Sequence, residues 1–194
     1  MTVTTPHQHQ PSLSFRPATP ADIPLLLPLI RSAYRGEASR KGWTTEADLV
    51  ADQRIDERGL LAKLEEPEGV VLLVTEDDAA VSTTTPPLAC CEVVRSKKDP
   101  TVAYFGLFAV NPARQAGGVG KTVLSFAEAY ARREWEGVVR MEMCVLWMRG
   151  ELIAWYERRG YGKTGERRPF PYAEMVGGVA LRDDLWFEVL EKVL

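Results

Sequence analysis

The feature that most constrains this chain is a glycine-rich turn between a β-strand pattern and a helical pattern. The segment is Val110-Asn111-Pro112-Ala113-Arg114-Gln115-Ala116-Gly117-Gly118-Val119-Gly120-Lys121-Thr122. Glycines let the backbone approach phosphate oxygens closely. The unpaired N–H groups at the start of the next helix point toward such an anion, and the helix dipole favours its charge. The segment therefore predicts a pyrophosphate cradle, for which two ligand classes compete.

One alternative is a nucleotide-binding P-loop, because Gly120-Lys121-Thr122 matches the end of G-x-x-x-x-G-K-[ST]. The first position of that motif must be glycine for the loop to curl around the phosphates, and here it is Gln115. A variant loop with a double glycine needs a lysine before the pair, where this chain has Ala116. The next predicted strand carries Glu142 but no aspartate at its end to help hold magnesium. These departures weigh against an NTPase.

The other alternative is the pattern Q-x-x-G-x-G, which Gln115, Gly118 and Gly120 satisfy after a strand ending at Val110. A second block at residues 154–161 reads A-W-Y-E-R-R-G-Y. It is similar to an A-x-x-Y-E-x-x-G-F segment. The two blocks resemble the GNAT-superfamily N-acetyltransferases, and the order of predicted elements extends the resemblance to nearly the whole chain. The family often has an asparagine near the start of the second helix, where residues 147–151 here read W-M-R-G-E.

The hydrophobic pattern predicts an α+β chain. Strands are expected at residues 13–16, 70–74, 88–94, 103–110 and 138–145, with two more suggested by Tyr161 and by residues 185–190. Helices are expected to about residue 34, after the glycine turn, and over 151–159, with helical turns within 36–63. The resemblance implies a GNAT-like fold, a central mixed, mostly antiparallel sheet of about seven strands flanked by helices.

Length and composition predict one domain. Residues 1–12 are polar and lack a signal-peptide pattern, so we expect a disordered tail followed by a single domain over 13–194. The net charge of −3 does not indicate binding to nucleic acid. No apolar run is long enough for a membrane span. Cys90 and Cys91 alternate across a strand, which disfavours a disulfide framework. We expect a cytoplasmic protein with reduced cysteines and no metal site. The sequence leaves a homodimer open.

The resemblance implies acetyl-CoA as co-substrate and assigns two catalytic groups. The backbone N–H of Val110 is the candidate for polarising the thioester carbonyl. Tyr156 lies where the family places a tyrosine that protonates the departing thiolate, although a core aromatic is the alternative. The full set of expected cofactor-binding residues is Phe108, Ala109, Val110, Gln115, Ala116, Gly117, Gly118, Val119, Gly120, Lys121 and Tyr156.

The general base cannot be identified from the sequence. An alkyl ammonium must lose its proton before attack, directly or through water. Glu92 and Glu142 lie in strands that could reach the cleft, but each could equally face solvent. Both histidines lie in the tail, which excludes a Ser-His-Asp or Cys-His arrangement, and Cys144 alone is a weak candidate because buried thiols are inert. Direct transfer without an acyl-enzyme is therefore expected.

The acceptor is expected to be a primary amine of a small molecule or peptide. In the family, the segment after the first helix and a late loop flank the acceptor site. The first segment is acidic with one aromatic, which fits a cationic amine, although a solvated helix face explains its charges as well. The expected substrate-binding residues are Glu37, Trp43, Glu46, Phe170 and Tyr172. An acyl-CoA-binding sensor without activity is the alternative function.

Overall fold

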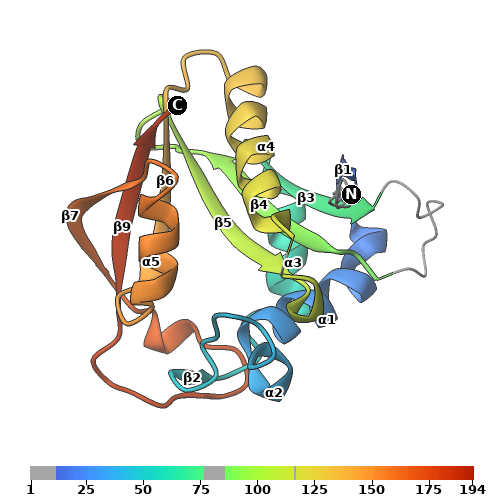
Figure 1. The fold of residues 1–194 in the computed structure, drawn as a ribbon, viewed down its shortest axis with the longest axis vertical. Coiled ribbons are helices and arrows are strands. Elements are labelled where there is room, and N and C mark those ends of the chain that lie inside the picture. Colours follow the sequence, from blue (N-terminus) through green and yellow to red (C-terminus); the bar gives the residue numbers. More distant parts are fainter. Residues whose placement is uncertain (1–11, 77–85, 116) are drawn as a thin grey trace, which may run out of the picture.

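A seven-stranded sheet forms the centre of the molecule (Figure 1). The computed structural model describes residues 12–76, 86–115 and 117–194. The strand order is β1-β3-β4-β5-β6-β9-β7, and only the β5–β6 pair is parallel. The strands are β1 (Leu13–Pro17), β3 (Gly69–Glu76), β4 (Ala89–Arg95), β5 (Val102–Val110), β6 (Arg140–Leu146), β7 (Gly162–Pro169) and β9 (Trp186–Val193). A small second sheet pairs β2 (Val50–Ala51) with β8 (Val179–Ala180).

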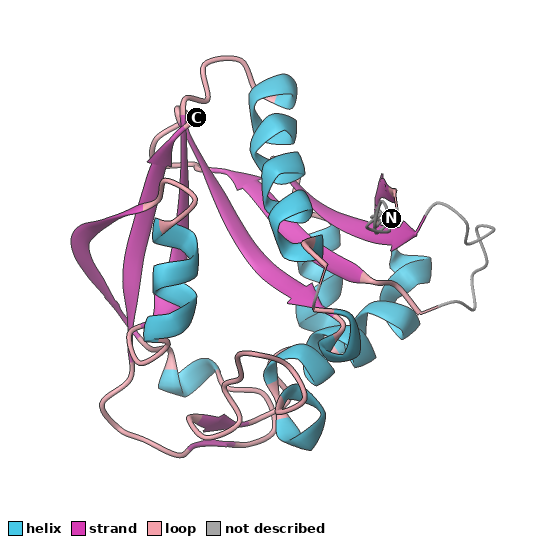
Figure 2. Cartoon of the chain, viewed as in Figure 1, coloured by secondary structure: helices cyan, strands magenta, loops and turns pink. Residues whose placement is uncertain are grey.

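Helices cover both faces of the sheet (Figure 2). One face packs against α4 (Val119–Glu134) and α5 (Gly150–Glu157), and the other against α1 (Ile23–Tyr34) and α3 (Glu57–Leu64). Cys90 contributes to the α1 side of the core and Cys91 to the α4 side, as alternation along a strand requires. The remaining helical segments are η1 (Pro20–Asp22), α2 (Gly36–Ser39), η2 (Pro112–Arg114) and η3 (Tyr172–Glu174).

Strands β5 and β6 pair at one end and separate toward the other (Figure 1). Their ladder covers only Val102–Tyr104 against Arg140–Glu142. Strand β5 is also irregular, because its register with β4 shifts between Cys90 and Glu92 and Leu107 has a φ of 45°. A bulge increases local twist and bends a strand. Among the described residues, the far half of β5 therefore has no strand partner on its β6 side, which opens the sheet at its middle.

The α+β architecture with a mostly antiparallel sheet confirms the expected fold, with corrections near the C-terminus. Tyr161 precedes β7, and its buried hydroxyl donates a 3.0 Å hydrogen bond to Glu128. Strand β9 lies between β6 and β7, an order that the sequence did not predict. The expected tail lies outside the described residues except for Ser12, and so does residue range 77–85 of the expected long connection. Within the described ranges, every helix is too short or too polar to cross a membrane.

Candidate active site

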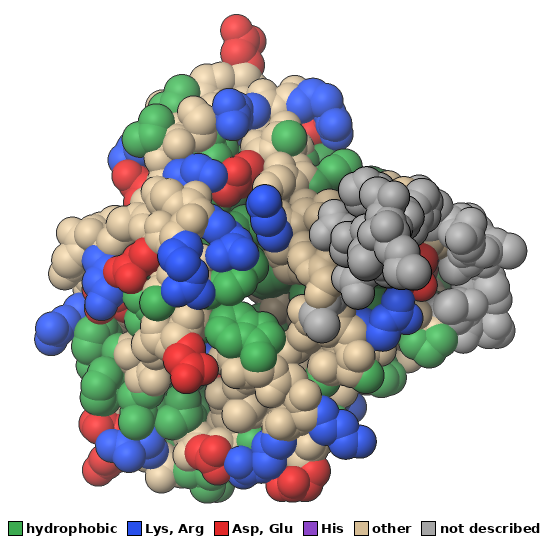
Figure 3. Space-filling model, viewed as in Figure 1, with side chains coloured by type: hydrophobic (Ala, Val, Ile, Leu, Met, Phe, Trp, Pro, Cys, Tyr) green, Lys and Arg blue, Asp and Glu red, His purple; other side chains and the backbone are tan. Residues whose placement is uncertain are grey.

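A cavity of about 480 Å³ lies where β5 and β6 separate. Figure 3 shows this face of the molecule hollowed near its centre, with hydrophobic and basic side chains around the opening. Residues from both faces of the sheet line the cavity, so it passes through the gap between the strands. The lining includes Tyr34 from α1, Trp43, Glu46 and Arg54 from the segment that follows α1, Tyr104 to Phe108 and Val110 from β5, Met143 to Leu146 from β6, and Gln115, Gly118, Gly120, Lys121, Trp155, Tyr156 and Arg159 from the α4 and α5 side.

The glycine turn presents the start of α4 to this cavity. Gly117 and Gly118 have φ values of 86° and 84°, in the left-handed region that favours glycine. Gly118 is the N-cap of α4, so no side chain in the described part of the chain caps the first N–H groups of that helix. A Cβ at Gly120 would contact Trp155 at 3.4 Å and Phe108 at 3.5 Å, which is ordinary packing distance. The turn therefore leaves open N–H donors beside Lys121, a geometry suited to a pyrophosphate.

Arg159 also lines the cavity, as the second basic side chain beside Lys121, and it was not among the residues predicted from the sequence. Its guanidinium lies 3.5 Å from the centroid of the Trp155 ring, and Nη1 donates a 2.7 Å hydrogen bond to the Trp155 carbonyl. Its Nε is buried and has no hydrogen-bond partner among the described residues. Burial, followed by the charge of Arg158, lowers the pKa of Arg159. A buried donor without a partner favours an anionic ligand here. The Arg158-Arg159 pair in the second sequence block was the available signal.

The backbone N–H of Val110 points away from β4. Val110 is paired with Ala89, and the N–H of Asn111 donates to the Leu88 carbonyl at 2.9 Å. Hydrogen-bonded and non-hydrogen-bonded pairs alternate in an antiparallel ladder, which puts Val110 in a non-hydrogen-bonded pair with β4. Its carbonyl accepts a 3.3 Å hydrogen bond from Gln115 Nε2 instead. The N–H on the same side of the strand is therefore directed to the gap beyond β5.

Tyr156 lines the same gap from α5. The residue is only 4% exposed, and its ring makes edge contacts with Trp155 and Tyr161. Burial raises the pKa of its phenol well above the ordinary value, so the hydroxyl is protonated at neutral pH. The described part of the chain supplies no hydrogen-bond partner for this hydroxyl. A neutral donor thus lies at the cavity wall.

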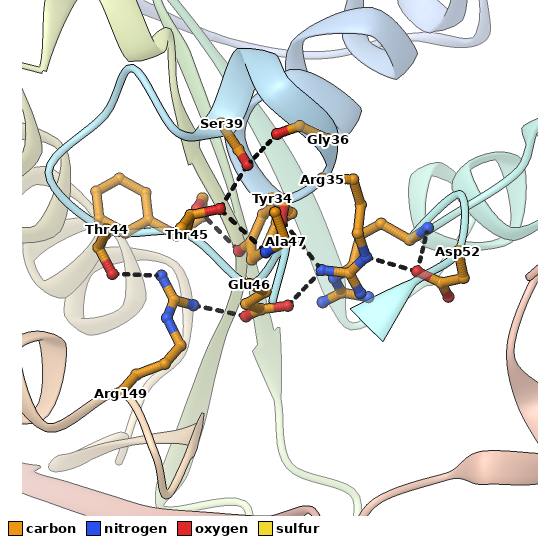
Figure 4. Close-up of polar contacts among 12 residues, drawn as sticks. Tyr34, Arg35, Gly36, Ser39, Thr44, Thr45, Glu46, Ala47, Asp52 and Arg149 are labelled. Atoms are coloured by element: carbon orange, nitrogen blue, oxygen red, sulfur yellow. Dashed lines mark hydrogen bonds and ion pairs between the residues drawn. The ribbon is translucent and has the colours of Figure 1, made fainter. Parts of the chain in front are cut away.

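Glu46 organises the opposite wall of the cavity (Figure 4). Its carboxylate accepts hydrogen bonds from Arg149 at 2.6 Å and from Arg35 at 2.5 Å. Arg35 also pairs with Asp52 at 2.5 Å. Burial alone would raise the pKa of Glu46, but Arg149, Arg35 and Arg54 outweigh burial and lower it. Both oxygens of the expected substrate-binding carboxylate are therefore already used within the protein.

The structure brings some of the expected site residues to the cavity and leaves others outside. Phe108, Trp43 and Phe170 line it. Glu37 is exposed on α2 and pairs with Arg40 at 3.0 Å, outside the cavity. The Tyr172 hydroxyl accepts a 2.8 Å hydrogen bond from the N–H of Leu185 and does not line the cavity. Ala109 and Val119 belong to the core, Gly117 lies on the exposed turn, and Ala116 lies outside the described residues.

Neither candidate base lines the cavity. Glu92 pairs with Lys63 at 2.7 Å, and Glu142 pairs with Arg168 at 2.7 Å. Cys144 does line it, but burial raises the pKa of its thiol, which disfavours a nucleophilic thiolate. Within the described ranges, no group of histidine, cysteine, aspartate or glutamate side chains is arranged to hold a metal ion.

Comparisons with solved structures support the fold. The chain resembles a GCN5-related N-acetyltransferase from Kribbella flavida, with 18% identity and a TM-score of 0.62, covering 94% of this chain and 98% of that one. It resembles the spermidine N-acetyltransferase from Vibrio cholerae in complex with CoA and spermine, with 12% identity, a TM-score of 0.63, and coverage of 93% and 95%. It also resembles the ribosomal-protein-S18-alanine N-acetyltransferase from Escherichia coli, with 14% identity, a TM-score of 0.61 and 94% of each chain covered. No curated protein matches the chain significantly.

A family comparison identifies the chain more directly. Residues 28–161 match the model described as the acetyltransferase (GNAT) family. The match spans more than half of the chain and includes the glycine turn, the gap between β5 and β6, and α5. The chain therefore belongs to the GNAT acetyltransferase family and is an acyltransferase that acts on an amine with acetyl-CoA as its co-substrate.

Proposed function

We propose that this protein transfers an acetyl group directly from acetyl-CoA to a primary amine of a small molecule or a peptide. The main support for this proposal is that one cavity, in the gap between β5 and β6, is lined by the start of α4, by Val110 and by Tyr156. A binding cradle, an N–H donor and a proton donor thus share one space.

The cofactor end of the cavity fits a pyrophosphate. The uncapped N–H groups after Gly118 would bind the phosphate oxygens, and the α4 dipole would favour their charge. Lys121 and Arg159 would add positive charge at the same edge. The left-handed Gly117 and Gly118 keep side chains off the turn, so the phosphates can approach the backbone.

Bound acetyl-CoA would supply an activated acetyl thioester. The N–H of Val110 would donate a hydrogen bond to the carbonyl oxygen as negative charge develops there. The hydroxyl of Tyr156 would donate its proton to the departing sulfur, so that free CoA leaves as the thiol. The second proton that the attacking nitrogen loses on forming the amide would restore the phenol, directly or through water. Glu92 and Glu142 are paired outside the cavity. We therefore propose that the attacking amine loses its proton to solvent rather than to either carboxylate.

The names of the structural neighbours support both acceptor classes. One neighbour is a spermidine N-acetyltransferase and another a ribosomal-protein-S18-alanine N-acetyltransferase. Small-molecule and protein amines are therefore both compatible with this fold, and the choice for this chain must come from its own residues.

A reducing, cytoplasmic location belongs to the same proposal. All three cysteines are free, and Cys90 and Cys91 are fully buried. Burial raises the pKa of Cys90 to about 12, which keeps that thiol protonated and unreactive. The net charge of −3 supports an acceptor other than nucleic acid. Whether the protein acts as a homodimer stays a prediction, which light scattering of the purified chain would test.

The test is release of free thiol from acetyl-CoA across a panel of amines and amine-bearing peptides. Turnover with at least one amine, and acetylated nitrogen in the product, would support the proposal. Binding of acetyl-CoA without turnover by any amine would favour the sensor alternative instead.

A further inference from the structure

Arg54 lines the cavity without a partner for its guanidinium. The guanidinium lies 5.0 Å from the centroid of the Tyr34 ring, and the residue is half-buried. Only its backbone N–H is bonded, to Asp52 Oδ1 at 3.0 Å, and the described residues supply no hydrogen bond to the side chain. Arg35 and Arg149, in contrast, both pair with Glu46. Three guanidiniums, those of Arg35, Arg54 and Arg149, thus face the two carboxylates of Glu46 and Asp52, which leaves one net positive charge at this wall.

The backbone at Arg54 is strained. Its φ is 64°, and among the described residues only Leu107, with a φ of 45°, is another non-glycine residue in the left-handed region. Both residues line the cavity. Neighbouring contacts hold the turn, because the Gln53 N–H donates to the Val176 carbonyl and the Ile55 N–H to the Gln53 carbonyl. Strain of this kind is retained mainly at functional sites.

Arg149 contributes a second unused donor near the same ring. Its carbon Cζ lies 6.0 Å from the Tyr34 centroid, and its Nη atoms bond Glu46 and Thr44. Its Nε is buried and has no partner among the described residues. Tyr34 is itself fixed, since its hydroxyl donates to the Phe108 carbonyl at 2.9 Å. Two guanidiniums with free donors therefore approach one immobilised aromatic ring.

The carboxylates at this end of the cavity do not accept hydrogen bonds from the guanidinium of Arg54 or from the Nε of Arg149. Glu46 and Asp52 are used by Arg35 and Arg149. The remaining carboxylate in the lining, Glu174, is exposed. The half-buried guanidinium of Arg54 has lost part of its hydration, and Glu46 and Asp52 attract its charge without accepting a hydrogen bond from it. A planar carboxylate matches the two-pronged donor geometry of arginine.

We infer that Arg54 binds a carboxylate on the acceptor, so that the substrate is an aminocarboxylate rather than a polycation. The inference rests on the proposed function, since it names the acceptor class of the same cavity. A polyamine has no anionic group to accept a hydrogen bond from Arg54, and the positive charge of Arg54 would repel it.

The experiment measures equilibrium binding of free amino acids, both α- and ω-amino, to the protein saturated with CoA, beside the primary amides of the same compounds. Each pair has nearly the same shape, but the amide lacks the negative charge and carries an NH2 donor in place of one carboxylate oxygen. We expect at least one amino acid to bind about 10- to 100-fold more tightly than its amide, the range of a charge-assisted hydrogen bond. Arg54→Gln should remove that preference, and Arg54→Lys should restore part of it. Arg58→Gln, an exposed arginine on α3, is the matched control.

Three results would overturn the inference: amides that bind as tightly as the acids, no acid that binds at all, or a preference unchanged in Arg54→Gln. Circular dichroism and the melting temperature verify that each variant is folded, and the wild-type acid and amide pairs decide the matter even where a variant is not. Because binding is measured without turnover, failure here is separate from failure of acetyl transfer, which the thiol-release assay reports.

Discussion

The side-chain oxygen of Gln115 accepts a 3.0 Å hydrogen bond from the backbone N–H of Trp43. The amide nitrogen of Gln115 meanwhile donates to the Val110 carbonyl. One side chain of the glycine turn thus joins the end of β5 to the loop at Trp43, which lines the cavity. A Cβ at Gly42 would lie 2.5 Å from the Gln115 oxygen, so the loop backbone approaches this amide closely. The glycine turn and the loop at Trp43 are therefore connected through the Gln115 side chain.

Gln115→Ala should weaken binding of both substrates. The change removes two hydrogen bonds, each with a net value of about 0.5–1.5 kcal/mol, and releases the Trp43 loop. We expect an increase in the acceptor KM together with a smaller increase in the acetyl-CoA Kd, with kcat less affected. Steady-state kinetics and calorimetry measure the two effects. An unchanged acceptor KM would show that this connection does not position the acceptor wall.

Ligand identity gives the second prediction. Acetyl-CoA should raise the melting temperature, because a ligand that binds only the folded state stabilises it by mass action. ATP with magnesium should not, because Gln115 replaces the first P-loop glycine and the described residues contain no cluster suited to a metal. Thermal unfolding with each ligand in excess measures both shifts. A shift with magnesium ATP alone would contradict the cofactor assignment.

Gly120 allows a sharper test of the cradle than Gly118. Gly118 is left-handed, so any side chain there strains the backbone, whereas a Cβ at Gly120 meets only ordinary contacts. Gly120→Glu should abolish acetyl-CoA binding, since its carboxylate would repel the phosphates. Gly120→Gln has nearly the same shape without the charge, and it should retain more affinity. Calorimetric titration compares the two, and equal affinities would place the phosphates elsewhere.

Arg159 is predicted to bind phosphate, and its neighbour provides the control. Arg159→Met keeps much of the packing on Trp155 but removes the charge and the unused Nε donor. We expect the acetyl-CoA Kd to increase about 10- to 100-fold, as for loss of a charge-assisted hydrogen bond. Arg158→Met should have little effect, because Arg158 is exposed and does not line the cavity. Equal effects of the two changes would indicate only a general electrostatic contribution.

The sequence predicted the parts of this protein that local patterns determine. Alternating apolar residues located the central strands, and the glycine turn located the start of α4. The strand order could not be predicted from the sequence, because β9 lies between β6 and β7 through long-range pairing that leaves no local pattern. The bulge opposite Cys91 and the short β5–β6 ladder, which both open the cavity, leave no local pattern either. The family resemblance alone implies a splayed strand before the glycine turn, with backbone groups of Phe108 to Val110 facing the acetyl and pantetheine arm.

Charge was the least predictable property of the site. The segment after the first helix contains several carboxylates and was expected to suit a cation. In the fold, Glu46 and Asp52 are neutralised by Arg35 and by Arg149, which lies 103 residues from Glu46 in the sequence. The cation whose side chain receives no hydrogen-bond partner from the described residues is instead Arg54. Ion pairs across such separations depend on tertiary structure, so counting charges in one segment cannot give the sign of the pocket.

Tyr156→Phe separates an enzyme from a binding protein. The change keeps the ring packed between Trp155 and Tyr161 and removes only the proton donor. If the phenol protonates the departing thiolate, kcat should fall about 10- to 1000-fold, near the range of general acid catalysis. The acetyl-CoA Kd should change little. Steady-state kcat with an accepted amine, beside the Kd from calorimetry, measures both, and full turnover in the variant would remove Tyr156 from the mechanism.

The pH dependence provides an independent test of the same group. A general acid acts in its protonated form, and burial raises the pKa of Tyr156 above its ordinary value near 10. The phenol therefore stays protonated through neutral and mildly alkaline pH, and only the acceptor amine changes its charge there. We expect kcat/KM to rise with pH as the amine deprotonates, and kcat to show no alkaline decline below about pH 10. A decline of kcat near pH 8 in the folded wild type, absent from Tyr156→Phe, would mean that the phenol ionises too readily to be the buried acid that this geometry requires.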